Sequence, residues 1–181
     1  GHEVCGTVVE LGEGVDRPLL GKRFVAETFF ETCQACNHCR NGRPNLCLAR
    51  KSIGSHVNGA MTSLVEVPVS NLHRVPDAMS DQAASLAEPL ACVTNSMFGE
   101  NPYVEPGFRT LVIGPGAIGL IAAQVSAVQG GEVMVRGTPA DQARMELAKK
   151  LGYEISNTDE DLPEETFDFV IECSGNSNGY A

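Results

Sequence analysis

The stretch RTLVIGPGAIG, residues 109–119, decides the fold of the C-terminal half of this chain. Its first five residues are typical of a buried β-strand, and Gly114, Gly116 and Gly119 follow at the spacing G-x-G-x-x-G. Between a strand and a helix, this spacing predicts a turn that binds the pyrophosphate of a dinucleotide, because the glycines permit a tight turn and close approach of the phosphates. A purely structural glycine turn is the alternative, and the strand–turn–helix context disfavours it.

The sequence after this turn alternates between helical and strand patterns. Helices are predicted over 117–129 and 140–151, and strands over 132–136, 154–156 and 167–173. Because strands joined through helices pair in parallel, the C-terminal half is predicted to be an α/β domain with a parallel sheet.

The N-terminal part of the chain carries short β-rich runs separated by turn residues. Strands are predicted over 4–11, 22–28, 61–67 and 73–75. This pattern is typical of an all-β barrel or sandwich.

The connection between the two parts is predicted from capping and turn residues. Ser80 suits the N-cap of a short helix, and Pro89 suits the first residue of the next helix because a proline disfavours helical geometry at the preceding Glu88. Glycine and proline then cluster within residues 94–107, where the domain boundary is predicted. The predicted domains are 1–97 and 98–181.

Composition excludes several classes of protein. The chain has 181 residues, a formal net charge of −10 and 43% hydrophobic residues, which fits a globular protein with a sizeable core. The acidic balance argues against a nucleic-acid or anionic-membrane partner. The sequence has no apolar run long enough to span a bilayer and no secretory signal pattern. Seven cysteines, four of them clustered, favour a reducing compartment, so a cytoplasmic location is predicted.

The clustered cysteines predict a metal site. Cys33, Cys36, Cys39 and Cys47 follow the spacing C-x2-C-x2-C-x7-C and supply the four thiolates of a closed tetrahedral zinc site. Small buried hydrophobic residues are one alternative, and an iron–sulfur cluster is another. Bacterial ferredoxin spacing places the fourth cysteine after three residues and before a proline, unlike the sequence here. The spacing therefore favours zinc in a structural role.

The corner after the second predicted strand of the α/β domain departs from the usual dinucleotide pattern. The acidic residue expected about 20 positions after the glycine turn is missing, and Arg136, Gly137 and Thr138 occupy this corner. Asp141 comes slightly later and is predicted to cap the next helix. Nothing at the corner excludes a 2′-phosphate, with which Arg136 or Arg144 would pair, so NADP is predicted to be at least tolerated.

Three further side chains are candidate functional groups because of their residue type. His2 and Glu3 precede a predicted strand, and Glu88 lies in the apolar stretch AASLAEPLACV. Carboxylates in apolar surroundings are rare unless they are paired or bound to a metal. From the residues alone, a structural and a functional role remain equally open.

Together these features resemble the zinc-dependent medium-chain alcohol dehydrogenases, and most closely their polyol and threonine dehydrogenase branch. The resemblance rests on the order and spacing of Gly1-His2-Glu3, the four-cysteine loop, Leu72-His73-x-Val75-Pro76, Glu88-Pro89-Leu90 and the glycine turn. It implies a mixed fold: a GroES-like β-barrel catalytic portion joined to a partial Rossmann α/β domain with a parallel sheet.

The resemblance also implies roles for single residues. His2 corresponds to a catalytic zinc ligand, and Glu3 and Glu88 to acidic residues at the same metal. Adjacent strand residues point to opposite faces, so His2 and Glu3 meet one ion only through a local bend. Cys5, further along this strand, is expected to pack in the core rather than to bind the metal. The four clustered cysteines correspond to the structural zinc lobe.

On the dinucleotide side, the resemblance assigns the pyrophosphate turn to Gly114, Gly116, Ile118 and Gly119. Thr138 and Arg144 correspond to contacts on the adenosine side. The tetrapeptide Glu172-Cys173-Ser174-Gly175 is similar to the family's strand-end motif beside the cofactor.

The implied activity is hydride transfer from an alcohol, such as a polyol, a secondary alcohol or a threonine-like substrate, to NAD or NADP. A homodimer or homotetramer is implied for the full-length protein. The family's first catalytic cysteine and the second half of its Rossmann domain have no counterpart here, so the 181 residues are expected to be an inactive fragment. A zinc-stapled binding or structural module is the alternative. A quinone-reductase-like protein is disfavoured because such proteins lack the zinc-lobe cysteines.

Overall fold

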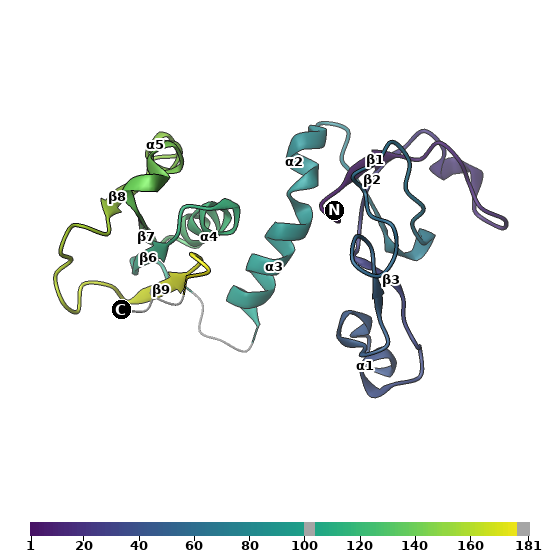
Figure 1. Ribbon diagram of the computed structural model, residues 1–181, viewed down its shortest axis with the longest axis horizontal. Helices are drawn as coiled ribbons and strands as arrows, with labels where there is room; N and C mark the ends of the chain where they lie inside the picture. Colours follow the sequence, from purple (N-terminus) through teal and green to yellow (C-terminus); the bar gives the residue numbers. More distant parts are fainter. Residues whose placement is uncertain (100–103, 177–181) are drawn as a thin grey trace. The chain divides into compact units, whose positions relative to one another are not determined.

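The computed structural model describes residues 1–99 and 104–176 and divides the chain into two compact units, 1–88 and 89–181. Figure 1 shows the elements of each unit. The predicted domains, 1–97 and 98–181, place the boundary later, near the end of helix α3 (Ala87–Phe98). Val93 and Met97 of this helix pack in the core of the second unit, which explains the earlier division. Pro102, in the predicted boundary stretch, lies outside the described residues.

The N-terminal unit is built from short antiparallel strands, as predicted. Strand β2 (Arg23–Ala26) pairs on one side with β1 (Cys5–Thr7) and on the other with β5 (Leu72–Arg74). Strand β3 (Phe29–Glu31) pairs separately with β4 (Lys51–Ser52). The strands are joined by turns and by the short helices η1 (Arg17–Leu19), α1 (Asn37–Arg40), η2 (Pro44–Leu46) and η3 (Val69–Asn71).

Two predictions for the N-terminal unit are wrong. Residues 61–67 form no strand, because Met61 and Leu64 are exposed and their alternation with polar residues meets no buried face. Helix α3 begins at Ala87, so that Glu88 is helical and Pro89 is the third helical residue. A proline fits the first turn of a helix because the N–H that it lacks would have no intrahelical partner there.

Helix α2 (Asp81–Ser85) begins where its capping residue predicts. The hydroxyl of Ser80 accepts a hydrogen bond from the backbone N–H of Ala83 at 3.2 Å. This bond satisfies one of the N–H groups that a helix leaves unpaired at its start.

The C-terminal unit is a parallel four-stranded sheet with the strand order β8-β7-β6-β9. Its strands are β6 (Arg109–Ile113), β7 (Glu132–Gly137), β8 (Glu154–Asn157) and β9 (Phe169–Glu172). Helix α4 (Ala117–Val128) connects β6 to β7, and η4 (Pro139–Asp141) with α5 (Gln142–Lys150) connects β7 to β8. This is the order of the first four strands of a dinucleotide-binding sheet, with β6 as the first strand.

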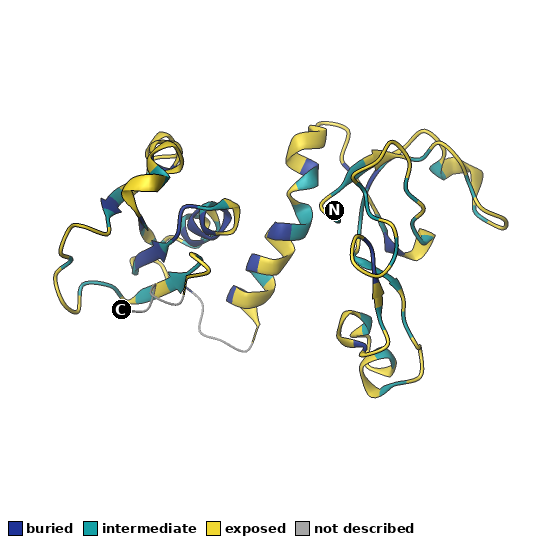
Figure 2. Ribbon diagram, in the orientation of Figure 1, coloured by how far each residue is buried: buried dark blue, intermediate teal, exposed yellow. Residues whose placement is uncertain are grey.

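The core of this unit lies around β6, β7 and α4, where buried residues concentrate (Figure 2). One cluster joins α3 to α4 through Val93, Met97 and Ile121, together with Val104. A second cluster packs α4 and α5 against the sheet; its buried members are Val112, Ala123, Val135, Met145 and Ala148. Since the sheet is fixed by this packing, the carboxyl end of β6 holds the glycine turn in a defined position.

No helix in the described ranges is both long enough and apolar enough to cross a bilayer.

Candidate metal and dinucleotide sites

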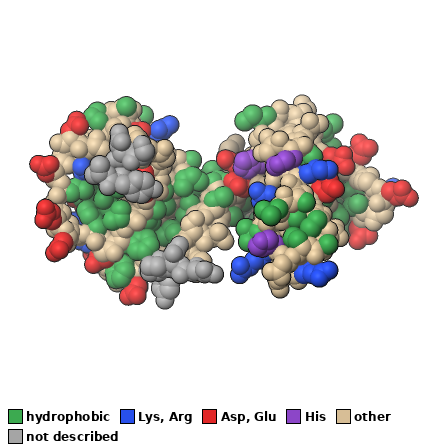
Figure 3. Space-filling view, turned by 60° about the horizontal axis from the view of Figure 1, so that its bottom comes forward, with side chains coloured by type: hydrophobic (Ala, Val, Ile, Leu, Met, Phe, Trp, Pro, Cys, Tyr) green, Lys and Arg blue, Asp and Glu red, His purple; other side chains and the backbone are tan. Residues whose placement is uncertain are grey.

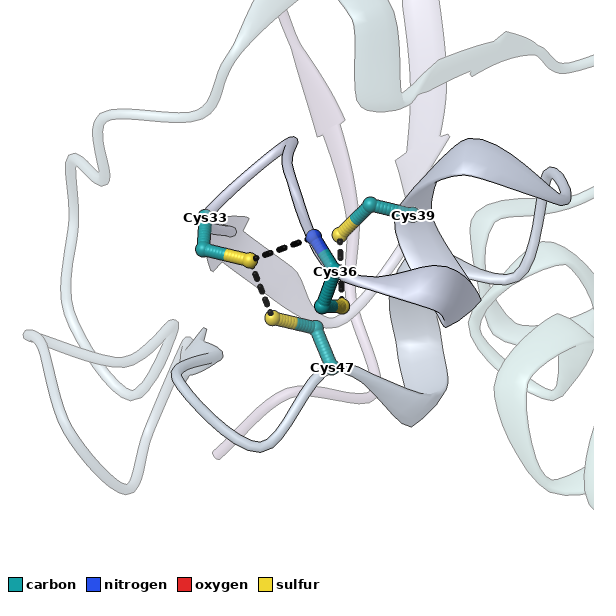
Figure 4. A group of neighbouring side chains, drawn as sticks. All are labelled: Cys33, Cys36, Cys39 and Cys47. Atoms are coloured by element: carbon teal, nitrogen blue, oxygen red, sulfur yellow. Dashed lines mark hydrogen bonds between the residues drawn. The ribbon is translucent and has the colours of Figure 1, made fainter.

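The four predicted metal-binding cysteines converge in space. Cys36 and Cys39 come from the start and the interior of α1, and Cys47 follows η2 (Figure 4). The sulfurs of Cys36 and Cys39 are 3.5 Å apart, and those of Cys47 and Cys33 are 3.6 Å apart. All four sulfurs lie within 4.8 Å of one another.

These distances fit one zinc ion. With Zn–S bonds of about 2.3 Å, a regular tetrahedron separates its sulfurs by about 3.8 Å. The observed spacing is close to this value, whereas a cluster of several irons would hold its thiolates further apart. The donor set therefore suits a closed structural zinc site, which the cysteine spacing predicts.

The surroundings shift the pKa values of two of these thiols, Cys33 and Cys39, in opposite directions. Backbone N–H groups of Ala35 and Cys36 lower the pKa of Cys33 to about 6; the Cys36 N–H lies 3.3 Å from the Cys33 sulfur. Burial and the contact with the Cys36 thiol raise the pKa of Cys39 to about 11. In the absence of metal, the lobe therefore holds a thiolate and a protonated thiol side by side at neutral pH.

A second cluster of metal-ligating side chains lies in the same unit. His2 Nε2 is 3.6 Å from Glu88 Oε1, and one donor atom each from His2, Glu3 and Glu88 lies within 4.8 Å of the others. The side chains of His2 and Glu88 are 43% and 22% exposed. Figure 3 shows histidine and acidic side chains next to each other on the surface of the N-terminal unit.

The backbone explains how neighbouring residues reach one point. His2 and Glu3 precede β1, which begins at Cys5, so strand alternation does not separate their side chains. Glu88 reaches the cluster from the first turn of α3. The local bend that a shared ion requires is therefore present. Three protein ligands are the number that a catalytic zinc uses while keeping one position open for substrate, and imidazole and carboxylate are both zinc ligands.

Cys5 does not join this cluster. The prediction that Cys5 packs in the core is wrong. Its thiol instead donates a hydrogen bond to Asp81 Oδ1, with a sulfur–oxygen distance of 3.6 Å. The same carboxylate oxygen accepts a hydrogen bond from Arg23 at 2.7 Å, and Arg23 also donates to the carbonyls of Pro76, Asp77 and Met79. This network ties the start of α2 to β2, and no local pattern of residues predicts it.

Each of the three glycines of the turn occupies its position for a different structural reason. Gly114 has φ +97°, and a Cβ on it would meet the Ser174 backbone N at 2.6 Å. A Cβ on Gly119 would overlap the carbonyl oxygen of Gly114, whereas one on Gly116 would meet no atom within 4 Å. Two glycines thus allow the turn and its packing, and the third leaves open space at the start of α4.

This open space is where a pyrophosphate would fit. The start of α4 provides unpaired backbone N–H groups and the positive end of the helix dipole. Ile118, the other predicted residue of the turn, is 41% exposed on the first turn of this helix. The strand-end motif lies at the same place, since Ser174 packs on Gly114 and its backbone N–H donates to Glu172 at 2.7 Å.

The corner after β7 is held by hydrogen bonds between its own side chains. Thr138 and Asp141 form a capping box, with the Thr138 hydroxyl donating to Asp141 Oδ2 at 2.7 Å. Asp141 thus has the predicted capping role at the short helix η4, whereas its side chain makes no capping hydrogen bond to α5, of which it is the N-cap residue. Arg144 donates to Asp141 Oδ1 at 3.1 Å, and the hydrogen bonds from Thr138 and Arg144 lower the pKa of this carboxyl.

Arg136, the other arginine predicted to pair with a 2′-phosphate, is used elsewhere. It donates to Ser156 Oγ at 3.0 Å and to the carbonyls of Thr158 and Glu160 at 3.2 and 2.8 Å. These acceptors lie on β8 and in the segment after it. Because they are distant in sequence from Arg136, the pattern of residues gave no sign of this role.

Comparison with known proteins adds independent information. Residues 1–77 match the family model of the alcohol dehydrogenase GroES-like domain. The chain is 37% identical over 185 residues to the sorbitol dehydrogenase of Halalkalibacterium halodurans, which covers 97% of this chain and 53% of that protein. The chain thus spans about half the length of the curated relatives it matches.

Solved structures agree with these matches. A zinc-binding dehydrogenase from Sinorhizobium meliloti 1021 bound to NADP gives a TM-score of 0.87 at 27% identity, covering 99% of this chain and 55% of that one. An alcohol dehydrogenase from E. coli CFT073 complexed with NADH gives 0.80 at 27% identity, covering 97% and 54%. The predicted fold class, a GroES-like β-portion followed by a partial Rossmann sheet, is confirmed.

Proposed function

We propose that this chain, a segment of a zinc-dependent medium-chain alcohol dehydrogenase, supplies the metal-binding and adenosine-binding parts of an enzyme that transfers hydride from an alcohol to NAD(P). The observation that carries the proposal is the convergence of His2, Glu3 and Glu88 within 4.8 Å. This cluster occurs in a chain that also holds a four-thiolate lobe and a dinucleotide turn. We further propose a polyol or another secondary alcohol as the substrate.

Each group of residues has a role in the proposed reaction. His2, Glu3 and Glu88 would hold the catalytic zinc, which when bound supplies a Lewis acid for the substrate hydroxyl. The start of α4 would bind the pyrophosphate and thereby orient the cofactor. Cys33, Cys36, Cys39 and Cys47 would hold the structural zinc and stabilise the loop that carries them.

The proposal includes the cellular location and the oligomeric state of the enzyme. Four of the seven cysteines converge as a metal-ligating group rather than as disulfide partners, which favours a cytoplasmic protein. A homodimer or homotetramer of the intact protein is part of the proposal because the resemblance to this family implies such an assembly.

A zinc-stapled module without catalysis is the competing function, and one pair of variants separates the two. His2→Ala in the intact protein is expected to abolish alcohol-dependent reduction of NAD(P) while the lobe keeps its zinc. His73→Ala is the matched control, because His73 forms a similar exposed pair with Glu27 at 2.9 Å. It is expected to retain activity.

The measurement is the initial rate with a panel of polyols and secondary alcohols, alongside zinc content by elemental analysis. Activity that survives His2→Ala, or an intact protein that binds zinc and oxidises no alcohol of the panel, would contradict the proposal. The second of these outcomes would favour the structural module.

A further inference from the structure

Three glycine backbones meet directly before the metal-ligating residue His2. A Cβ on Gly54 would lie 2.8 Å from the carbonyl oxygen of Gly1 and 3.0 Å from its carbonyl carbon. A Cβ on Gly59 would lie 2.7 Å from the same oxygen and 2.7 Å from Gly54 Cα. All of these neighbouring atoms belong to the backbone, so no side-chain rotation relieves the overlap, and glycine is required at both positions.

The segment 52–60, which carries two of these glycines, begins with a closed turn. The Ser52 carbonyl accepts hydrogen bonds from the backbone N–H of His56 at 2.8 Å and from those of its two neighbours at 3.2 and 3.3 Å. The Ser52 N–H in turn donates to His56 Nδ1 at 3.1 Å. Ile53 is 2% exposed, and its N–H donates to the Thr28 carbonyl at 2.8 Å. The turn is therefore fixed to the rest of the N-terminal unit.

The same segment holds the Gly1 carbonyl by a hydrogen bond. The backbone N–H of Ala60 donates to this oxygen at 2.8 Å. The carbonyl belongs to the peptide plane that joins Gly1 to His2, and that plane contains the Cα atom of His2. Contacts that fix the carbonyl therefore fix the point from which the imidazole begins.

The position of the His2 side chain depends on this backbone. Its imidazole is 43% exposed and lies 3.6 Å from Glu88 Oε1, which is longer than a hydrogen bond. Metal–ligand distances tolerate deviations of only about 0.2 Å. A displacement of the His2 backbone would therefore be felt at an ion that His2 shares with Glu3 and Glu88.

We infer that Gly54 and Gly59 are positioning residues for the metal: they hold the Gly1 carbonyl where His2 can meet Glu3 and Glu88 at one ion. This inference rests on the proposed function, because it concerns the same metal site. It adds two residues that carry no ligand atom.

Gly59→Ala tests the inference. Gly54 has φ +77°, which disfavours alanine by itself, whereas Gly59 has no positive φ, so the steric contact alone decides the effect. The added methyl group must displace the Gly1 carbonyl or the segment 52–60. In the intact protein, the metal affinity of the His2 site is expected to fall by at least about tenfold, as when groups that orient a ligand are disturbed.

Cadmium titration followed by cadmium NMR measures the two metal sites separately. Four thiolates and a site with nitrogen and oxygen ligands give separate resonances, so the cysteine lobe serves as an internal reference. In Gly59→Ala, the resonance of the His2 site is expected to shift or disappear while the lobe resonance and the lobe affinity stay unchanged. A general loss of stability would instead affect both resonances.

Gly6→Ala is the matched control. Gly6 lies on β1, a few residues beyond His2, and a Cβ on it would meet no atom of the described residues within 4 Å. This variant is expected to keep both resonances and both affinities. An equal weakening of the His2 site in Gly6→Ala and Gly59→Ala would overturn the inference.

Two further measurements do not depend on adding a methyl group. His56→Ala removes the acceptor of the Ser52 N–H and is expected to weaken the His2 site by a smaller factor than Gly59→Ala. Because coupling between two sites is reciprocal, filling the His2 site of the unaltered protein is expected to slow hydrogen exchange at the Ala60 amide. The reference state for this exchange is the protein with cadmium in the lobe alone.

The possible outcomes separate the inference from the proposed function. An unchanged resonance and affinity of the His2 site in Gly59→Ala overturn the inference, and so does an Ala60 exchange rate that is the same with and without metal at that site. If Gly59→Ala loses the lobe resonance as well, the variant has lost its fold and the Ala60 exchange rate decides. An intact protein that binds cadmium in the lobe alone contradicts the proposed function, and the inference with it.

Discussion

Replacing Cys39 by serine should weaken zinc binding in the cysteine lobe by about two orders of magnitude. The Cys39 sulfur lies 3.5 Å from that of Cys36, within a set of four that fits one ion. Structural zinc sites bind with about 10–16 kcal/mol, so one of four thiolates corresponds to about 3 kcal/mol. At about 1.4 kcal/mol for each factor of ten, this is about a hundredfold loss of affinity.

The pH dependence of zinc binding gives the same prediction a second readout. The raised pKa of Cys39, about 11, means that zinc must displace its proton at neutral pH, whereas Cys33, with a pKa of about 6, is already largely ionised. Apparent zinc affinity should therefore rise with pH above 7, with Cys39 contributing a factor of about ten per unit. Serine in place of Cys39 should lower this slope by one proton.

Competition with a chromophoric chelator between pH 7 and 9 measures both quantities, and limited proteolysis reports whether residues 33–47 stay folded. Cys92→Ser is the control, since Cys92 lies on α3, outside the lobe. Cys39→Ser should expose the lobe to cleavage, and the control should not. Zinc affinity and slope that are unchanged in Cys39→Ser, or iron in place of zinc, would refute the assignment.

Two other substitutions test the packing of the units. Gly119→Ala should destabilise the C-terminal unit by about 1–3 kcal/mol and abolish binding of adenosine monophosphate, because its Cβ overlaps the Gly114 carbonyl; urea unfolding checks this, and wild-type stability would contradict it. Asp81→Asn should lower the unfolding midpoint at pH 7 but not at pH 2. Its hydrogen bond with Arg23 lowers the pKa of Asp81, so the contribution is present above an unfolded-state pKa of about 4 and is lost as the pH falls through the folded-state value. An equal difference at both pH values would count against this bond.

The features that could be predicted from the sequence are those encoded by neighbouring residues. The strand–turn–helix around Gly114 and the cysteine spacing are local patterns, and the structure reproduces both. The Thr138–Asp141 capping box is local as well. In each case the residues that define the feature follow one another closely along the chain.

The features that escaped prediction depend on distant partners. Residues 61–67 alternate like a strand but find no buried face to occupy. The Arg23–Asp81 bond and the contacts of Arg136 with the segment after β8 join elements that only the fold brings together. The meeting of His2 with Glu88 was predictable only through resemblance to a family, because neither residue marks the other in the sequence.

The measurement that tests the central claim most directly is the fate of deuterium from a labelled alcohol. The intact protein is incubated with secondary alcohols and polyols deuterated at the carbinol carbon and with NAD or NADP, and the reduced nicotinamide is analysed by NMR and mass spectrometry. Direct hydride transfer predicts one deuterium at C4 of the nicotinamide, on one face only, and no product from the His2→Ala variant. Deuterium that is lost to solvent, or the absence of reduced cofactor with every alcohol tested, would contradict the account.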